Sequence, residues 1–100
     1  MGWAIQYIDS LRAGRTVQFR PRGNSMVGII KSGQLCTVEP ARRALLQVGQ
    51  VVLCKVNGRE YLHLIKAVSG ERFQMGNNRG LINGWVSVNA IFGILTKVED

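Results

Sequence analysis

The chain has 100 residues, 46% of them hydrophobic and 19% charged, with thirteen Lys and Arg against six Asp and Glu. This length indicates one domain with one core, and the composition excludes a chain that is mainly disordered. No apolar run reaches the roughly 20 residues that a membrane span needs, and the first ten residues do not resemble a secretory signal, so we expect a cytoplasmic protein without a membrane partner.

The first predicted element is a short amphipathic helix over residues 3–13. Its large apolar side chains recur at intervals of three and four residues: Trp3, Tyr7, Ile8 and Leu11. Gly14 stands where such a helix would end. We expect the apolar stripe to dock on the core, with a membrane-surface or partner-binding helix as the alternative.

After Gly14 the apolar pattern changes to a period of two or to short β-branched runs, which are typical of strands. The predicted strands are Thr16–Arg20, Gln34–Glu39, Gln50–Val56, Tyr61–Val68, Arg72–Met75 and Ile91–Val98. Asn57 and Gly58 tolerate positive φ, which predicts a hairpin between the third and fourth strands. Residues 41–46 fit either a single helical turn or a loop.

These elements predict a mostly β fold in the form of a small, partly open β-barrel with one short N-terminal helix. We expect a single domain, 1–100, in which residues 1–14 form the helix and residues 15–98 form the β domain.

A serine follows a glycine turn after the first predicted strand, in the segment Pro21–Met26. Ser25 would expose its hydroxyl beside backbone N–H groups, which is the arrangement that an acyl-transfer nucleophile needs. Gly23, Asn24 and Met26 would then line the oxyanion and substrate cleft. Because helix N-caps are Ser more often than nucleophiles are, the local sequence alone favours a cap.

His63 is the only histidine and lies in a predicted strand. Alternation places Tyr61, His63 and Ile65 on one face of that strand and Lys66 on the other, so Lys66 would share the pocket of His63 only through a bulge. A histidine with apolar neighbours is usually a satisfied core residue. The alternative is a general base for Ser25, because a neutral imidazole accepts a hydroxyl proton at pH 7.

A third stretch, over residues 75–85, is rich in Asn and Gly and predicts a structural loop whose amides cap their own backbone. In the functional alternative, Asn77 or Asn83 orients the imidazole of His63, as Asn does in Cys-His-Asn proteases.

Four arginines fall within eleven residues that contain no acid: Arg12, Arg15, Arg20 and Arg22. They indicate either a solvated surface or a patch for weak, salt-sensitive nucleic-acid binding without sequence specificity.

Cys36 and Cys54 are predicted to be buried free thiols, because neither lies in a close Cys pair or near a second histidine. We therefore expect no metal and no cofactor.

Taken in order, segments over about residues 20–98 resemble the superfamily of LexA-type autopeptidases and signal peptidases. They correspond to the family's nucleophile motif, two glycine-led strands, base-bearing strand, Gly-Asp-Asn box and closing strand: Gly23–Met26, Lys31–Val38, Val48–Leu53, Tyr61–His63, Gly76–Asn78 and Ile91–Gly93. The resemblance implies the peptidase fold of that family, with Ser25 as nucleophile and His63 as general base. Asn77 stands where the box has its acid, and an amide stabilises an imidazolium less than a carboxylate does, so reduced activity is expected.

Two functions are compatible with these residues. One is a serine peptidase-like domain that hydrolyses a peptide bond through Ser25 and His63. The other is a catalytically inactive module that binds a peptide or a nucleic acid on the same fold. Exposed strand edges allow either a monomer or a homodimer. The distance between the Ser25 hydroxyl and the His63 ring separates the two functions.

Overall fold

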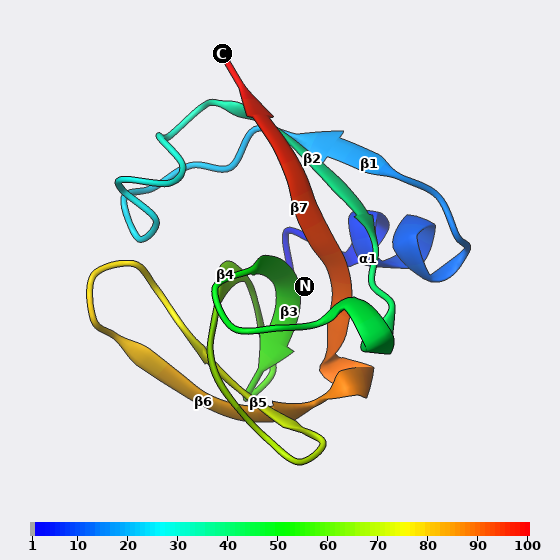
Figure 1. The fold of residues 1–100 in the computed structure, drawn as a ribbon. Helices are drawn as coiled ribbons and strands as arrows, with labels where there is room; N and C mark the ends of the chain where they lie inside the picture. Colours follow the sequence, from blue (N-terminus) through cyan, green and yellow to red (C-terminus); the bar gives the residue numbers. More distant parts are fainter. Residues whose placement is uncertain (1) are drawn as a thin grey trace.

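A single antiparallel sheet of seven strands makes up most of the computed structural model, which describes residues 2–100 (Figure 1). The elements in chain order are α1 (Ile5–Arg12), β1 (Val17–Phe19), β2 (Leu35–Pro40), β3 (Val51–Val56), β4 (Arg59–Ser69), β5 (Arg72–Gly76), β6 (Ile82–Ser87) and β7 (Ile91–Glu99). The strand order is β1-β2-β7-β3-β4-β5-β6. The mostly β prediction is confirmed, but the sheet is not closed into a barrel, because β1 and β6 are its two ends and do not pair with each other.

The predicted helix and the six predicted strands are present, with bounds that differ by one or two residues at most ends. Asn57 and Gly58 form the expected hairpin turn, with φ of 50° and 81°. The ambiguous segment contains a single 3₁₀ turn, Arg43–Leu45, and a second such turn, Val88–Ala90, precedes β7. The interpretation of residues 75–85 as a loop is wrong in its second half, because β6 begins at Ile82.

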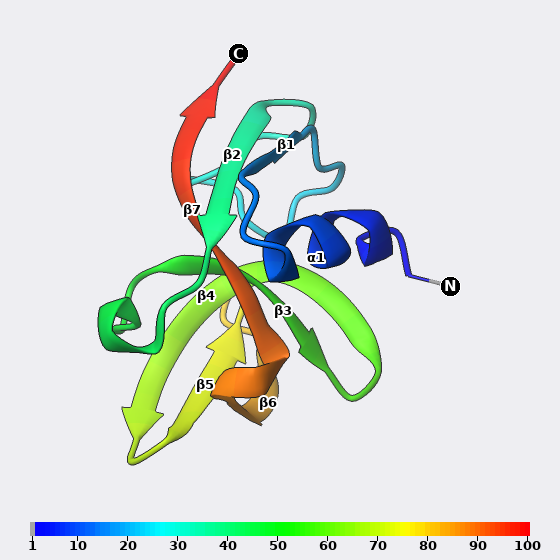
Figure 2. The same ribbon diagram turned by 90° about the vertical axis from the view of Figure 1, so that its right-hand side faces the viewer.

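β7 joins two halves of the molecule. Its C-terminal part pairs with β2 and its N-terminal part pairs with β3. Figure 2 shows β7 running from the lower half, which contains β3 to β6, into the upper half with β1 and β2. Side chains that lie far apart in the sequence therefore meet where the two halves face each other.

The buried side chains form two clusters rather than the single expected core. β3 explains the division, because Val51 and Leu53 belong to the first cluster while Val52 and Cys54 belong to the second. The first cluster lies under α1, whose Ile8 and Leu11 are buried, so the helix stripe docks on the core as expected. No helix within residues 2–100 is long and apolar enough to cross a membrane.

Both cysteines are buried free thiols, as predicted. Burial raises the pKa of the Cys36 thiol and raises that of Cys54 to about 12. Both side chains therefore stay protonated near neutral pH and act as small apolar groups in the two clusters.

Candidate functional site: a serine, a histidine and an asparagine in one cleft

The loop that carries Ser25 connects β1 to β2 and is anchored by its own residues. Met26 and Ile30 bury their side chains in the first cluster. At the base of the loop the Gly33 N–H donates to the Pro21 carbonyl at 2.8 Å, and the Gly23 N–H donates to the Ser32 hydroxyl at 3.1 Å. The loop is therefore fixed from below, and Ser25 is exposed at its surface.

A chain of side chains links Ser25 to two strands of the other half. The Ser25 hydroxyl lies 3.3 Å from Nε2 of His63 on β4, and Nδ1 of His63 lies 2.7 Å from Oδ1 of Asn83 on β6. Because the amide oxygen only accepts, Nδ1 carries the proton and donates to Asn83. Nε2 is then unprotonated and faces the serine, so the Ser25 hydroxyl donates to it.

Asn83 reaches the histidine because β6 contains a bulge. Gly76 pairs with Ile82 and Met75 pairs with Gly84, so Asn83 is an extra residue without a partner on β5. A bulge redirects the side chain of the inserted residue, and the following Gly84 permits it with a φ of 142°. The Asn-Gly pair inside a short apolar run is a sequence signal for a bulged strand. The prediction of a loop over residues 75–85 did not use this signal.

Asn77 does not provide the orienting contact. Its side-chain oxygen accepts hydrogen bonds from the N–H groups of Arg79 and Leu81, at 2.8 and 2.9 Å. The amide therefore caps the turn between β5 and β6, which is the structural alternative for this stretch. Of the two asparagines expected near His63, Asn83 alone makes the hydrogen bond to the ring.

His63 is a buried imidazole with an aromatic neighbour, since only 5% of the residue is exposed. The Tyr61 ring stacks on it at a centroid distance of 4.7 Å, as expected for residues two apart on one strand face. Burial lowers the pKa of His63, the hydrogen bond to Asn83 opposes this shift, and the positive charge of Lys66 lowers the pKa further. The ring is therefore neutral at pH 7 and able to accept a proton.

Lys66 is the inserted residue of a bulge in β4, because Ile65 pairs with Met75 while Ala67 pairs with Gln74. Among the described residues, the lining of the cleft beside Ser25 and His63 does not include Lys66. Its charge lowers the pKa of His63 without a shared pocket, because charges act at a distance.

The backbone around Ser25 supplies candidate oxyanion donors. Residues 24–30 form a tight turn in which Asn24 and Met26 carbonyls accept the N–H groups of Val27, Ile29 and Ile30. Within the described residues, the N–H groups of Ser25 and Met26 donate to no protein acceptor, as is usual for the first turn of a helical segment. The Gly23 N–H donates to the Ser32 hydroxyl and is therefore not a candidate oxyanion donor. Gly23 instead allows the backbone to adopt a φ of 120° at this turn.

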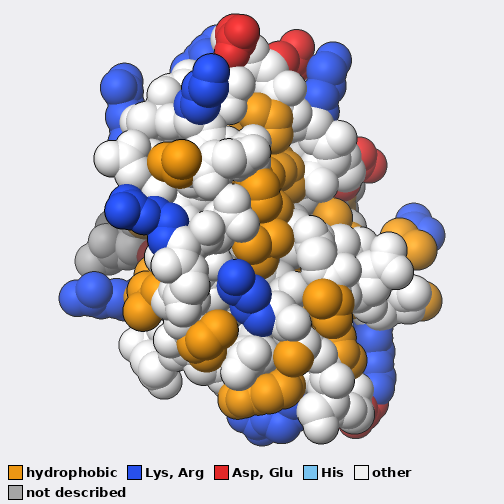
Figure 3. Space-filling model, turned by 60° about the vertical axis from the view of Figure 1, so that its left-hand side comes forward, with side chains coloured by type: hydrophobic (Ala, Val, Ile, Leu, Met, Phe, Trp, Pro, Cys, Tyr) orange, Lys and Arg blue, Asp and Glu red, His pale blue; other side chains and the backbone are white. Residues whose placement is uncertain are grey.

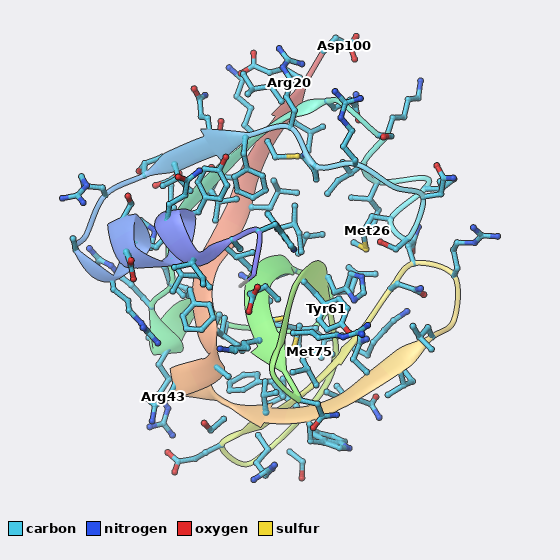
Figure 4. All side chains as sticks on the ribbon, turned by 180° about the vertical axis from the view of Figure 1, so that it is seen from behind. Arg20, Met26, Arg43, Tyr61, Met75 and Asp100 are labelled. Carbon is cyan, nitrogen blue, oxygen red and sulfur yellow. The ribbon has the colours of Figure 1, made fainter. Side chains whose placement is uncertain are left out.

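A cleft of about 480 Å³ opens beside Ser25 and His63. Its lining includes Met26 from the loop, Tyr61 from β4 and Arg20. In Figure 4, Met26 and Tyr61 lie near each other and Arg20 lies above them. The further lining includes residues that the sequence analysis did not single out as site residues: Trp3, Tyr7, Phe19, Lys31 and Glu60. Trp3 and Tyr7 are four residues apart, so one face of the N-terminal segment contributes both.

The four arginines of the predicted basic patch do not share one site. Arg20 and Arg22 line the cleft, whereas Arg12 lies over the Phe92 ring at 4.9 Å in a separate hollow. On the face shown in Figure 3, Lys and Arg side chains are spread around the surface with hydrophobic side chains between them.

Among the residues that the structure describes, no three His, Cys, Asp or Glu side chains are grouped closely enough to hold a metal ion.

No protein-family model matches this sequence, and no curated protein is significantly similar to it.

Proposed function

We propose that this chain is a serine peptidase-like domain of the LexA and signal-peptidase type, in which Ser25, His63 and Asn83 hydrolyse a peptide bond. One observation carries the proposal: an exposed serine hydroxyl, a neutral buried imidazole and an amide oxygen form a continuous hydrogen-bonded chain at the edge of a cleft. Nucleophile, base and orienting group are the three parts of a catalytic triad.

In the proposed reaction, Ser25 Oγ attacks the carbonyl carbon of the scissile bond while its proton moves to Nε2 of His63. The N–H groups of Ser25 and Met26 stabilise the negative charge that develops on the carbonyl oxygen. His63 then gives its proton to the leaving amine, and an acyl-enzyme remains on Ser25. A water molecule attacks the ester carbon, loses a proton to His63, and releases the acid as Ser25 regains its proton.

Asn83 holds the ring throughout this cycle in the tautomer that keeps Nε2 available. Its amide stays neutral, so it stabilises the imidazolium less than a carboxylate would. We therefore expect slow turnover.

The test compares four proteins on a peptide library read by mass spectrometry: the parent, Ser25→Ala, Asn83→Asp and the control Asn77→Asp. Ser25→Ala removes the nucleophile and is expected to lower the cleavage rate by roughly 1,000-fold or more. Asn83→Asp is expected to raise it at least about tenfold, because the carboxylate stabilises the imidazolium. Asn77→Asp is the matched control, since Asn77 bonds its own turn instead of the ring.

Cleavage that persists unchanged in Ser25→Ala would contradict the proposed mechanism. Folded variants with no cleavage in any of them, Asn83→Asp included, would favour the second candidate, a binding module without catalysis. The amide at Asn83, in the place where a carboxylate would serve catalysis best, is the observation that favours this second candidate.

A further inference from the structure

The cleft beside Ser25 has an aromatic wall whose rings are fixed by one another. Phe19 stacks on Tyr7 at 4.6 Å and meets the edge of Trp3 at 5.5 Å. The Trp3 indole N–H also donates to the Glu60 carbonyl at 3.4 Å. Yet 49% of Trp3 is exposed, so a held aromatic surface borders the cleft without a covering group among the described residues. Such a surface suits a large apolar side chain of a ligand.

The same cleft is positively charged. Arg20, Arg22 and Lys31 line it, and Glu60 is the one acidic residue among the described residues of its lining. The Arg20 guanidinium donates to the Gly33 carbonyl at 2.9 Å, which holds its charge at the rim. The Glu60 carboxylate lies 3.9 Å from the Lys55 ammonium, so its charge is paired, and the three cations of the lining outnumber it. An acidic ligand is therefore favoured.

We propose that the cleft selects an extended peptide segment that carries a bulky apolar side chain together with acidic side chains. The apolar side chain packs against Trp3, and the carboxylates face Arg22 and Lys31. This inference rests on the proposed peptidase function in taking a peptide as the ligand, but it concerns recognition and does not require cleavage.

The test uses Ser25→Ala, so that bound peptide stays intact, and three fluorescein-labelled ten-residue peptides. The first carries one phenylalanine flanked by two aspartates, the second replaces both aspartates by lysine, and the third replaces the phenylalanine by alanine. Fluorescence anisotropy is expected to show at least tenfold tighter binding of the first peptide than of either other peptide.

Matched variants in the Ser25→Ala background show which residues produce the preference for phenylalanine and the preference for aspartate. Trp3→Ala is expected to abolish the preference for phenylalanine, whereas Trp85→Ala, which changes a tryptophan of similar exposure on β6 outside the cleft, leaves it intact. Arg22→Glu is expected to abolish the preference for aspartate, whereas Arg15→Glu, outside the cleft lining, preserves it.

Equal binding of the three peptides would overturn the inference. So would an equal loss of the preference for phenylalanine in Trp85→Ala and in Trp3→Ala. Displacement of the first peptide by a single-stranded oligonucleotide at lower concentration than by unlabelled peptide would also overturn it, in favour of nucleic acid. Selective binding that depends on Trp3 and Arg22 supports it even if the parent protein cleaves none of the peptides, and that result would count against the peptidase function alone. Cleavage of all three peptides at equal rates would support the peptidase function and contradict the proposed selectivity.

Discussion

The imidazole of His63 is held by neighbours of three kinds, each with a different effect on its proton. Asn83 accepts the Nδ1 proton and favours the charged ring, Tyr61 stacks on one face, and Lys66 opposes a second positive charge nearby. Burial has the largest effect and lowers the pKa of the ring below its ordinary value of 6.5. The residue is thus kept as a base at neutral pH, which is the protonation state that the proposed reaction needs.

This lowered pKa predicts the pH dependence of activity. The active form has neutral His63, so kcat/KM is expected to fall as the pH drops through the pKa of the ring, at a pH below 6.5. Lys66→Met removes a positive charge and is expected to raise that pKa, which moves the acid limb to higher pH. Lys97→Met, on the exposed part of β7, is the control and leaves the profile unchanged. An acid limb above pH 6.5 in the parent would contradict the role of a buried His63 as base, and a profile unaffected by Lys66→Met would show that the Lys66 charge does not act on the ring.

At this scale the sequence indicates residue types better than contacts. The pairing of Ser25 with His63 is predicted from the order of motifs in the family resemblance, whereas the residues alone favour a helix cap and a core histidine. The structure places the Ser25 hydroxyl 3.3 Å from the ring. The choice of Asn83 over Asn77 depends on a bulge in β6. A bulge shifts the register by one residue, which periodicity by itself does not reveal.

Two glycine–glutamine turns lead into strands β2 and β3. Gly33 and Gly49 have φ of 87° and 95°, and each precedes a glutamine just before a strand. Gln34 accepts the Lys31 N–H at 2.7 Å, and Gln50 accepts the Gln47 N–H at 3.0 Å. Both side chains thus close the turn that leads into β2 or β3. These strands are predictable from sequence because turn chemistry and apolar pattern agree, whereas in β6 Asn and Gly interrupt the apolar pattern.

The Ser25 loop and the β5–β6 turn support each other across the cleft edge. In Figure 1 the two loops lie one above the other on the left side of the molecule. The Asn78 N–H donates to the Ser25 carbonyl at 3.0 Å, and its side-chain amide donates to the Val27 carbonyl at 2.7 Å. Asn78 therefore holds the backbone of Ser25 and Val27, although its own side chain is exposed.

Asn78→Ala is expected to remove the side-chain bond to Val27 and keep the backbone bond to Ser25. The free energy of unfolding should fall by about 1 kcal/mol, as is typical for one hydrogen bond, and kcat/KM should fall with little change in its pH profile. Urea denaturation and steady-state kinetics measure the two effects. Arg79→Ala, at the next exposed position, is the control. Parent-like kinetics in Asn78→Ala would show that the loop is held without this contact.

The site is shared between the two halves of the molecule. Ser25 comes from the half that contains β1 and β2, while His63 and Asn83 come from β4 and β6 in the other half. β7 connects these halves through one continuous strand that pairs with both β2 and β3. We therefore expect the distance between the Ser25 hydroxyl and the His63 ring to depend on how closely the strands pack along β7, in addition to the contacts of Asn78 at the cleft edge.

Gly93 is a point on β7 where that packing leaves no room for a side chain. It pairs with Pro40 on β2 and with Leu53 on β3, and α1 lies against it. A Cβ at this position would lie 2.5 Å from Val38 Cγ1 and 2.9 Å from both the Glu39 carbonyl oxygen and Leu11 Cδ1. Because one of these neighbours is backbone and the others are buried, there is no room for a methyl group unless the halves or the helix move.

Gly93→Ala is accordingly expected to lower the free energy of unfolding by about 2 kcal/mol, as overpacked cores typically do. In a domain of this length that corresponds to a fall in Tm of roughly 8–16 °C. Differential scanning calorimetry measures this change, and Lys97→Ala, an exposed position on the same strand, is the control that should stay near the parent Tm. Below the transition, the folded variant should also lose peptidase activity, because a shift between the halves separates Ser25 from His63. A parent-like Tm with reduced activity, or a lowered Tm with parent-like kcat/KM in the folded state, would show that β7 does not couple the fold to the geometry of the site.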